Sequence, residues 1–167
     1  SGLETIADIA GAITKALKKS ATVYICGNGG SAADAQHIAA ELVNRFESNR
    51  RALPAIALTT DSSVMTSIAN DYDYESVFAR QAEALVRKGD IFWAISTSGS
   101  SPNVLAAVKV ARKKGAVVLA FTGRKNSRIE RLADICFCAD SESAARSQEV
   151  HLLAYHIICK LVEQSFA

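Results

Sequence analysis

The sequence predicts an α/β fold in which helices cover both faces of a doubly wound, five-stranded parallel sheet. Short apolar runs alternate along the chain with longer segments whose apolar residues recur at helical spacing. The short runs are continuously apolar, which is typical of parallel strands buried on both faces. With 167 residues, 49% of them hydrophobic, and neither linker nor internal repeat, the chain is expected to form a single domain over residues 1–167.

The first half of the chain opens with a helix, because apolar residues recur there at helical spacing. Lys18 and Lys19 follow as the cations that a helix C-terminus favours. A buried strand then leads through a glycine-rich turn into a second helix, and Gly89 is expected to end the last helix of this half. The expected elements are a helix over residues 3–17, a strand over 22–26, a helix over 32–46, a strand over 54–58, a short helix opening at 62 and a helix over 75–87.

The second half continues the alternation of strands and helices. Pro102 suits the first turn of a helix, and Gly115 follows that helix as its stop. The expected elements are a strand over residues 91–95, a helix over 103–114, a strand over 116–121, a short helix over 127–132, a strand over 135–139 and a long helix over 144–166.

Composition excludes several functional classes. The chain carries 19 Lys and Arg against 17 Asp and Glu, a net charge of +2, so no nucleic-acid partner is expected. No apolar run approaches the about 20 residues that span a membrane, and no signal-peptide pattern opens the chain. We therefore expect a cytoplasmic protein without a membrane partner, whose four cysteines are reduced. Cys136 and Cys138 would share one strand face, but no second cysteine pair completes a metal site.

Polar loops follow the strands at positions where parallel α/β sheets bind ligands. The first, residues 26–31, has three glycines in four positions before a helix start, yet it matches neither a P-loop nor a dinucleotide fingerprint. The second, residues 96–102, carries five hydroxyl side chains, more than a helix cap requires, and suits a phosphate monoester. Asn70 and Asp71 could reach substrate hydroxyls or simply form a turn.

Ionisable side chains that could carry chemistry fall on two of the predicted helices. His37 and Glu41 are four residues apart and share one helix face. The last helix carries Gln148, His151 and His156, and helical phase separates its two histidines by about 140°. Two histidines, a carboxylate and an amide could bind a divalent metal, or a carboxylate and an imidazole could act as base and acid. Spacing alone leaves open which histidine faces His37 and Glu41.

These residues resemble the phosphoheptose isomerases of the sugar isomerase (SIS) domain family, which have a flavodoxin-like fold. The serine loop alone is typical of the wider family of sugar-phosphate binders. Its combination with the glycine loop, the His37–Glu41 pair, Gln148 and His156 is far more specific. The similarity covers nearly the whole chain, in the segments CGNGGSAADAQHIAAEL (26–42), PAIALTTD (54–61), ND (70–71), ISTSGSSPNV (95–104) and ARSQEVHLLAYHIICKLVE (145–163).

The resemblance implies an isomerase that converts sedoheptulose 7-phosphate to D-glycero-D-manno-heptose 7-phosphate, the first step of bacterial ADP- or GDP-heptose and lipopolysaccharide biosynthesis. It implies a homotetramer with sites at subunit interfaces and one divalent ion, usually Zn²⁺, per subunit. The implied metal ligands are His37, Glu41, Gln148 and His156, of which Glu41 and His156 are also catalytic. The implied substrate-binding residues are Asn28, Gly29, Gly30, Ser31, Arg45, Asn70, Asp71, Ser96, Thr97, Ser98, Ser101 and Gln148.

The mechanism expected from the resemblance is an enediol route. Glu41 would remove a carbon-bound proton and His156 would transfer a proton at the other side, while the metal polarises the oxygens. A carboxylate committed to a metal is a poor base, so Glu41 would shift between the two roles. Two alternatives stay open: a tetrameric adaptor that binds a replication-initiator protein, and a sugar-phosphate sensor without turnover. Family members usually begin with about one more helix before the position of Ser1, which contributes to subunit packing.

Overall fold

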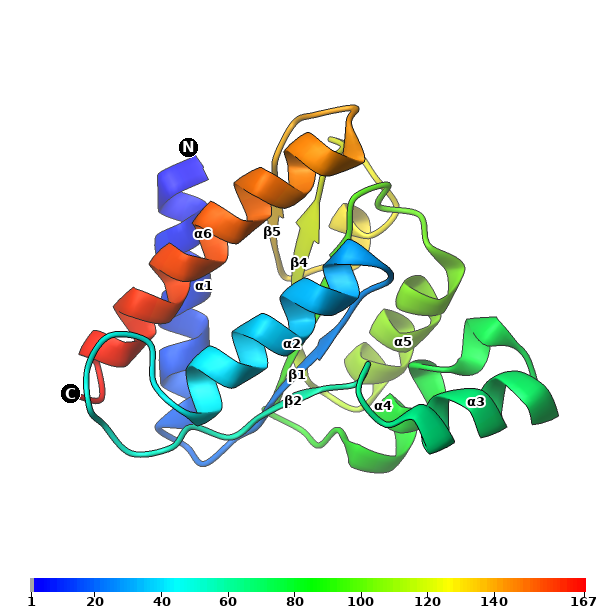
Figure 1. Cartoon of the computed structure of the whole chain (residues 1–167), viewed down its shortest axis with the longest axis horizontal. Helices are drawn as coiled ribbons and strands as arrows, with labels where there is room; N and C mark the ends of the chain where they lie inside the picture. Colours follow the sequence, from blue (N-terminus) through cyan, green and yellow to red (C-terminus); the bar gives the residue numbers. More distant parts are fainter. Residues whose placement is uncertain (1) are drawn as a thin grey trace.

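Five parallel strands form the central sheet, in the order β2-β1-β3-β4-β5 (Figure 1). This computed structural model describes residues 2–167. The order reverses direction between β1 and β3, which confirms the doubly wound arrangement and puts the topological switch point between the loops that follow these two strands. The strands are β1 (Val23–Cys26), β2 (Ala55–Ala57), β3 (Ile91–Ser96), β4 (Val117–Thr122) and β5 (Ile135–Cys138).

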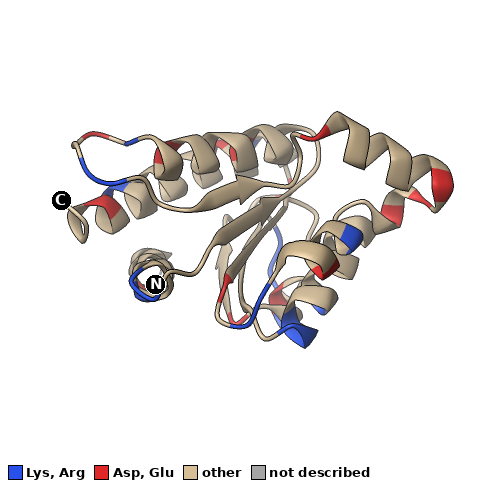
Figure 2. Cartoon of the chain, turned by 90° about the horizontal axis from the view of Figure 1, so that it is seen from below, with Lys and Arg blue, Asp and Glu red and all other residues tan. Residues whose placement is uncertain are grey.

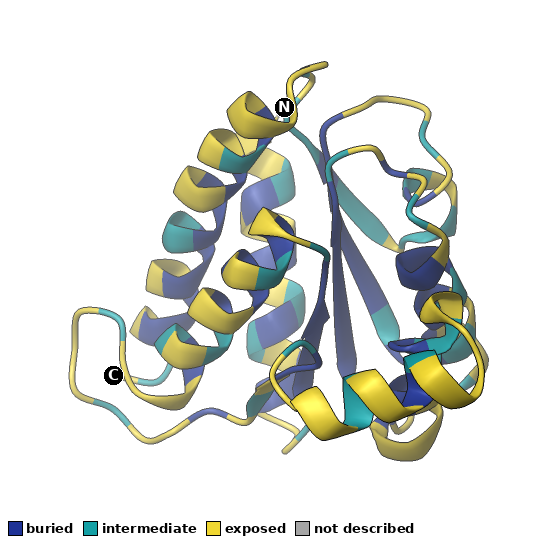
Figure 3. Cartoon of the chain, turned by 45° about the vertical axis from the view of Figure 1, so that its right-hand side comes forward, coloured by how far each residue is buried: buried dark blue, intermediate teal, exposed yellow. Residues whose placement is uncertain are grey.

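Helices pack against both faces of the sheet, so that most strand residues are buried between two layers (Figure 3). One face carries Ile25 and Trp93 under α1 (Gly2–Leu17), α2 (Gly30–Val43) and α6 (Ala144–Gln164). The other carries Tyr24 and Phe92 under the remaining helices, which are α3 (Ser62–Asp71), the 3₁₀ turn η1 (Tyr74–Ser76), α4 (Ala79–Leu85), α5 (Pro102–Lys113) and the 3₁₀ turn η2 (Glu130–Leu132).

The prediction of a helix through residue 46 is wrong, because α2 ends at Val43. The backbone N–H of Asn44 still donates to the carbonyl of Ala40, but the following N–H groups at residues 46–48 donate to the carboxylate of Glu163 on α6. A side chain from another element therefore draws the chain out of the helix.

Two other predicted helices are shorter than their patterns indicate. Residues 75–87 divide into η1 and α4, because the Asp73 carboxylate accepts a hydrogen bond from Ser76 N–H and so caps the first piece separately. Residues 127–132 form only η2, since the N–H of Ile129 donates to the carbonyl of Gly99 instead of extending a helix. A local cap therefore divides the first segment, whereas a tertiary contact overrides the local periodicity in the second.

Charged residues of both signs lie on the helices and loops around the sheet (Figure 2). This distribution agrees with the net charge of +2. Of the helices in the described part of the chain, none combines the length and the apolar character needed to cross a bilayer.

Candidate active site

The glycine loop follows β1 at the switch point of the sheet. Gly29 has φ +57°, a backbone conformation that residues other than glycine rarely adopt. The Asn28 amide exchanges two hydrogen bonds of 2.9 Å with the amide of Asn103, in the first turn of α5. The hydroxyl of Tyr74 donates to the Asn28 oxygen at 3.2 Å. These bonds join the glycine loop to the helix that follows the serine loop.

The serine loop follows β3 and turns its hydroxyls toward one another. The Ser96 Oγ is 3.0 Å from Ser101 Oγ and 3.4 Å from Ser98 Oγ, and Ser96 is buried. Gly99 has φ +64°, and a Cβ there would lie 2.3 Å from the Cβ of Ser127, so the turn requires glycine. Convergent hydroxyl donors at the N-terminus of a helix form a site that suits a phosphate group.

His37, Glu41 and His156 lie together between α2 and α6. One potential ligand atom from each residue falls within 4.8 Å of the other two. The Nε2 of His37 is 2.9 Å from Glu41 Oε1, and the rings of His37 and His156 are 5.0 Å apart at their centroids. The ring of Phe46 covers His156 at 5.5 Å. The His37 and Glu41 side chains are 42% and 19% exposed, so the cluster is open to a ligand.

The two helices that build this cluster run side by side in the same direction (Figure 1). Gly30 lies against Gln148, and His37 contacts Tyr155 seven residues further along each helix. A Cβ on Gly30 would come within 2.7 Å of the amide carbon and both terminal atoms of Gln148. At about 1.5 Å of rise per residue, Gln148 is therefore about 10 Å along the helices from His37. Within this chain Gln148 lies with the glycine loop.

The donor set of the cluster fits a divalent metal such as zinc. Two imidazole nitrogens and a carboxylate oxygen are ligand types that zinc prefers, and a catalytic zinc site uses three protein ligands with one position open. Ligand atoms of one tetrahedral zinc lie about 3.4 Å apart. The three ligand atoms all lie within 4.8 Å of one another, and His37 Nε2 and Glu41 Oε1 are 2.9 Å apart, so a shared ion would require only small side-chain adjustments. Among residues 2–167 no second group of His, Cys, Asp and Glu side chains meets the same distance criterion, Cys136 and Cys138 included.

Two residues behind the cluster were missed by sequence reasoning. The hydroxyl of Tyr155 is 2.9 Å from His37 Nδ1 and 3.5 Å from Asp34 Oδ1. Burial, followed by the charge of Asp34, raises the pKa of the Tyr155 hydroxyl, which therefore keeps its proton. Burial also raises the pKa of the Asp34 carboxyl, against a hydrogen bond from Tyr155 that lowers it. The available signals were that Asp34 precedes His37 by three residues on one helix face and that Tyr155 adjoins His156.

His151 lies apart from the cluster. Its side chain is fully buried against the sheet, where Nε2 is 3.1 Å from the carbonyl oxygen of Thr122 and the ring contacts Phe121. Burial lowers the pKa of His151, against the hydrogen bond to Thr122. The helical phase of α6 predicted that His151 and His156 face different ways, and the structure places His156 toward α2.

Most of the remaining predicted substrate residues are exposed. Asn70 and Asp71 end α3, where the Asn70 amide donates to the Asp71 carboxylate at 2.9 Å, and the segment reaches the glycine loop through Tyr74. Arg45 lies beyond the end of α2 and donates to Asn49 at 2.8 Å. Gly29 and Gly30 are exposed on the glycine loop, whereas Ser31 is buried.

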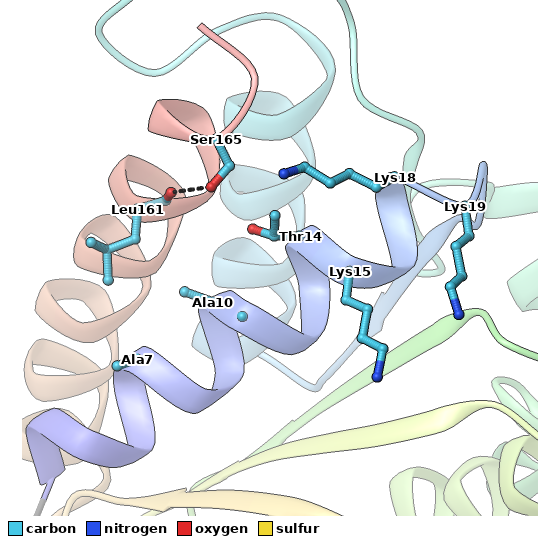
Figure 4. A pocket seen from close by; sticks show the side chains of 9 residues that line it. Ala7, Ala10, Thr14, Lys15, Lys18, Lys19, Leu161 and Ser165 are labelled. Atoms are coloured by element: carbon cyan, nitrogen blue, oxygen red, sulfur yellow. Dashed lines mark hydrogen bonds between the residues drawn. The ribbon is translucent and has the colours of Figure 1, made fainter.

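A separate groove of about 550 Å³ lies between α1 and the last turns of α6 (Figure 4). Lys15, Lys18 and Lys19 stand on one side of it and Leu161 on the other. Since β1 starts directly after α1 ends, this groove is at the amino edge of the strands. The glycine and serine loops are at the carboxyl edge, so the groove is not part of the site.

Comparison with known proteins identifies close relatives. Residues 2–123 match the SIS domain family. The chain is 50% identical over 160 residues to a phosphoheptose isomerase of Roseiflexus sp., covering 96% of this chain and 81% of that protein. Among solved structures, phosphoheptose isomerase GmhA from Neisseria gonorrhoeae superposes with a TM-score of 0.91 at 40% identity, covering 96% of this chain and 86% of that chain. A phosphoheptose isomerase from Francisella tularensis superposes with a TM-score of 0.93 at 38% identity and the same coverage.

Proposed function

The chain belongs to the phosphoheptose isomerases of the SIS domain family and is a sugar-phosphate isomerase, and we propose that it converts sedoheptulose 7-phosphate to D-glycero-D-manno-heptose 7-phosphate. The observation that carries this proposal is the cluster of His37, Glu41 and His156 between α2 and α6. The reaction needs a base and an acid on either side of two neighbouring carbons, and this cluster offers both.

The separation of the two candidate subsites supports a long, terminally phosphorylated sugar. The hydroxyls of residues 96–101 and the start of α5 would hold the phosphate, and Asn28 at the glycine loop would contact the sugar. His37 lies about 10 Å further along α2 than Gly30. The reacting carbons of a heptose 7-phosphate are at the end opposite its phosphate. Binding energy from the remote phosphate would then orient these carbons at the cluster.

The proposed chemistry is proton transfer by an enediol route. Glu41 would take the proton from carbon and His156 would transfer a proton on the other side, each contributing about 10²–10⁴-fold. A zinc ion would be held by His37, Glu41 and His156, and supplies polarisation of the carbonyl and hydroxyl oxygens when bound. The resemblance assigns two roles to Gln148, metal ligand and substrate-binding residue. Its position against Gly30 favours the substrate-binding role.

The proposed assembly is a homotetramer with the site at a subunit interface. Several large apolar side chains of α6 are exposed in the single chain, among them Leu153 at 63% and Leu152 at 42%. Exposed apolar side chains on one helix support burial by another subunit. Arg45, exposed beyond α2, would contact substrate in a neighbouring subunit. The product would enter bacterial heptose biosynthesis, including that of lipopolysaccharide, in the cytoplasm.

The test is a coupled assay on sedoheptulose 7-phosphate, run with added zinc and again after chelation. We expect formation of heptose 7-phosphate with zinc, its loss after chelation and its recovery when zinc is restored. Glu41→Gln should keep sugar-phosphate binding but lose turnover by at least about 10²-fold. Glu149→Gln is the matched control, since Glu149 is exposed on α6 and forms an ion pair of 2.7 Å with the equally exposed Arg146.

Each outcome separates the candidate functions. Absence of turnover in every condition, with bound sugar phosphate, would reject the isomerase proposal in favour of a sensor. Absence of both turnover and sugar-phosphate binding would favour an adaptor. Turnover that survives Glu41→Gln would reject the assignment of Glu41 as base. Measurement of zinc after purification without chelator tests the cofactor directly, because an adaptor has no reason to hold one ion per subunit.

A further inference from the structure

His37 is held at both ring nitrogens. Its Nδ1 is 2.9 Å from the Tyr155 hydroxyl, and its Nε2 is 2.9 Å from Glu41 Oε1. A neutral imidazole carries one N–H and one lone pair, so the proton can serve only one of these contacts. The partner on Nδ1 therefore determines whether Nε2, which faces Glu41, offers a proton or a lone pair.

Tyr155 stands between His37 and a buried carboxylate. The Tyr155 side chain is fully buried, and its hydroxyl also lies 3.5 Å from Asp34 Oδ1. Asp34 is 9% exposed, and its other oxygen, Oδ2, has no hydrogen-bond partner among residues 2–167. A buried carboxylate without donors is costly, so Asp34 is the acceptor that gains most from the single Tyr155 proton.

Two arrangements of the protons satisfy these contacts differently. In the first, Tyr155 donates to Asp34 and accepts from Nδ1–H of His37, which leaves a lone pair on Nε2. In the second, Tyr155 donates to Nδ1 and Nε2–H donates to Glu41, which leaves Asp34 without a donor. The first arrangement puts the Nε2 lone pair beside the Glu41 carboxylate, and a cation between these groups and His156 relieves that repulsion.

We propose that Tyr155, backed by Asp34, is the positioning residue that presents Nε2 of His37 as a metal ligand. The inference rests on the proposed function, because it concerns the divalent ion proposed for the cluster. Tyr155 does not contact that ion; it holds the His37 ring and its tautomer from behind. Groups that orient a metal-binding histidine in this way typically change metal affinity by about 10–100-fold when they are removed.

The first test is zinc binding by Tyr155→Phe, measured by competition with a chromophoric chelator. This change keeps the buried ring and removes only the hydroxyl. The control is Tyr24→Phe, since Tyr24 is also buried and its hydroxyl donates to the carbonyl of Leu85 on the other side of the sheet. We expect zinc affinity to fall about 10–100-fold in Tyr155→Phe and to stay within about threefold of wild type in Tyr24→Phe. Asp34→Asn keeps an oxygen that can accept from Tyr155, and should cause a smaller loss.

The second test reads the tautomer by ¹⁵N NMR of the imidazole nitrogens in the wild-type protein. The chain has only three histidines, so His37 can be assigned by comparison with variants of the other two. In the zinc-loaded protein we expect the proton of His37 on Nδ1, protected from exchange. The tautomer is read in the wild-type protein, so this result does not depend on the folding of Tyr155→Phe or Asp34→Asn.

The outcomes distinguish failure of the proposed zinc site from failure of the role proposed for Tyr155. If wild type binds no zinc, the proposed cofactor role fails and this inference falls with it. If wild type binds zinc and Tyr155→Phe binds it equally well, the inference alone is overturned. A His37 proton on Nε2 in the zinc-loaded protein would overturn it as well. Weakened zinc binding confined to Tyr155→Phe and Asp34→Asn, with the proton on Nδ1, would support it.

Discussion

The Glu163 carboxylate binds the chain segment that follows α2. Its replacement by glutamine tests how much these contacts contribute to the free energy of unfolding. Glu163 is 3% exposed near the end of α6, and the equally buried Arg50 has its Nε 3.5 Å from Glu163 Oε1. The carboxylate also accepts three backbone hydrogen bonds of 2.7–2.8 Å, from Phe46, Glu47 and Ser48. This anchoring holds Phe46 against the ring of His156 in the cluster.

The magnitude follows from how these bonds divide between the two oxygens. Oε2 accepts from Glu47 and Ser48, whereas Oε1 accepts from Phe46 and faces Arg50. In Glu163→Gln one of these positions becomes an NH₂ group that points at N–H donors, and Arg50 loses its buried counter-charge. A hydrogen bond to a charged group contributes about 1.5–3 kcal/mol, and breaking a buried ion pair costs about 3–5 kcal/mol. We therefore expect the free energy of unfolding to fall by about 3–5 kcal/mol, a large share of the usual 5–15 kcal/mol or so.

The same contacts predict a dependence on pH. Burial raises the pKa of the Glu163 carboxyl, but the three backbone donors and Arg50 together bring it below its ordinary value. A carboxyl whose pKa is lowered in the folded state contributes stability above its unfolded pKa of about 4.3, and that stability is lost as the pH falls through the lowered value. The difference between wild type and Glu163→Gln should therefore shrink in acid.

The assay is urea unfolding at constant protein concentration, at neutral pH and again in acid. Glu47→Gln is the control, since Glu47 makes a half-exposed ion pair of 2.9 Å with Lys160 and should contribute less than about 1 kcal/mol. A loss in Glu163→Gln no larger than that of Glu47→Gln at neutral pH would refute the reasoning. So would a difference that grows in acid.

Three further predictions concern the buried His151 and the serine and glycine loops. Burial lowers the pKa of His151, so in mild acid the unfolded chain binds a proton that the folded chain does not. The free energy of unfolding should therefore fall below about pH 6.5, by up to about 1.4 kcal/mol per pH unit. Urea unfolding at pH 7.5 and 5.5 should show this slope in wild type and a smaller one in His151→Phe. Gly99→Ala should weaken sugar-phosphate binding in calorimetry, because its Cβ would collide with Ser127 at a positive φ, and unchanged affinity would contradict the serine-loop assignment. Asn103→Ala should raise KM for the sugar phosphate by about tenfold, since it removes the two hydrogen bonds between Asn28 and Asn103 and leaves the Asn28 amide only the bond from Tyr74. An unchanged KM would show that this pair does not order the glycine loop.

Local patterns in the sequence were sufficient for the order of the elements. The apolar runs at β1 and β3 and the periodic segments at α1 and α6 were recognisable because burial on both faces and 3.6-residue periodicity leave a direct imprint on residue type. The boundaries were less accurate, for reasons that differ from place to place. Beyond α2 the Glu163 carboxylate of α6 captures the backbone N–H groups of residues 46–48, and near η2 the N–H of Ile129 donates to the distant Gly99. At η1 the cause is local, because Asp73 caps a separate 3₁₀ turn before α4 begins.

Some features of the candidate site were predictable from the sequence and others were not. Helical spacing alone put His37 and Glu41 on one face, and the phase of α6 alone separated His151 from His156. The partner of His37 on α6 required the resemblance or the structure, because the offset between α2 and α6 is a property of their packing. The buried pair Tyr155 and Asp34 was not recognised, since a tyrosine and an aspartate on two helices carry no mark of their contact in the sequence.

The sequence by itself determined the parallel α/β architecture, the two candidate ligand loops at the ends of β1 and β3 and the chemical types of the candidate site residues. These features depend on periodicity, turn chemistry and side-chain donors, which act within a few residues of chain. Only the tertiary structure decided that Gln148 lies beside Gly30 and that Tyr155 supports His37. These contacts join residues more than one hundred positions apart. Their geometry is set by how two helices pack over a sheet, which no local interaction specifies.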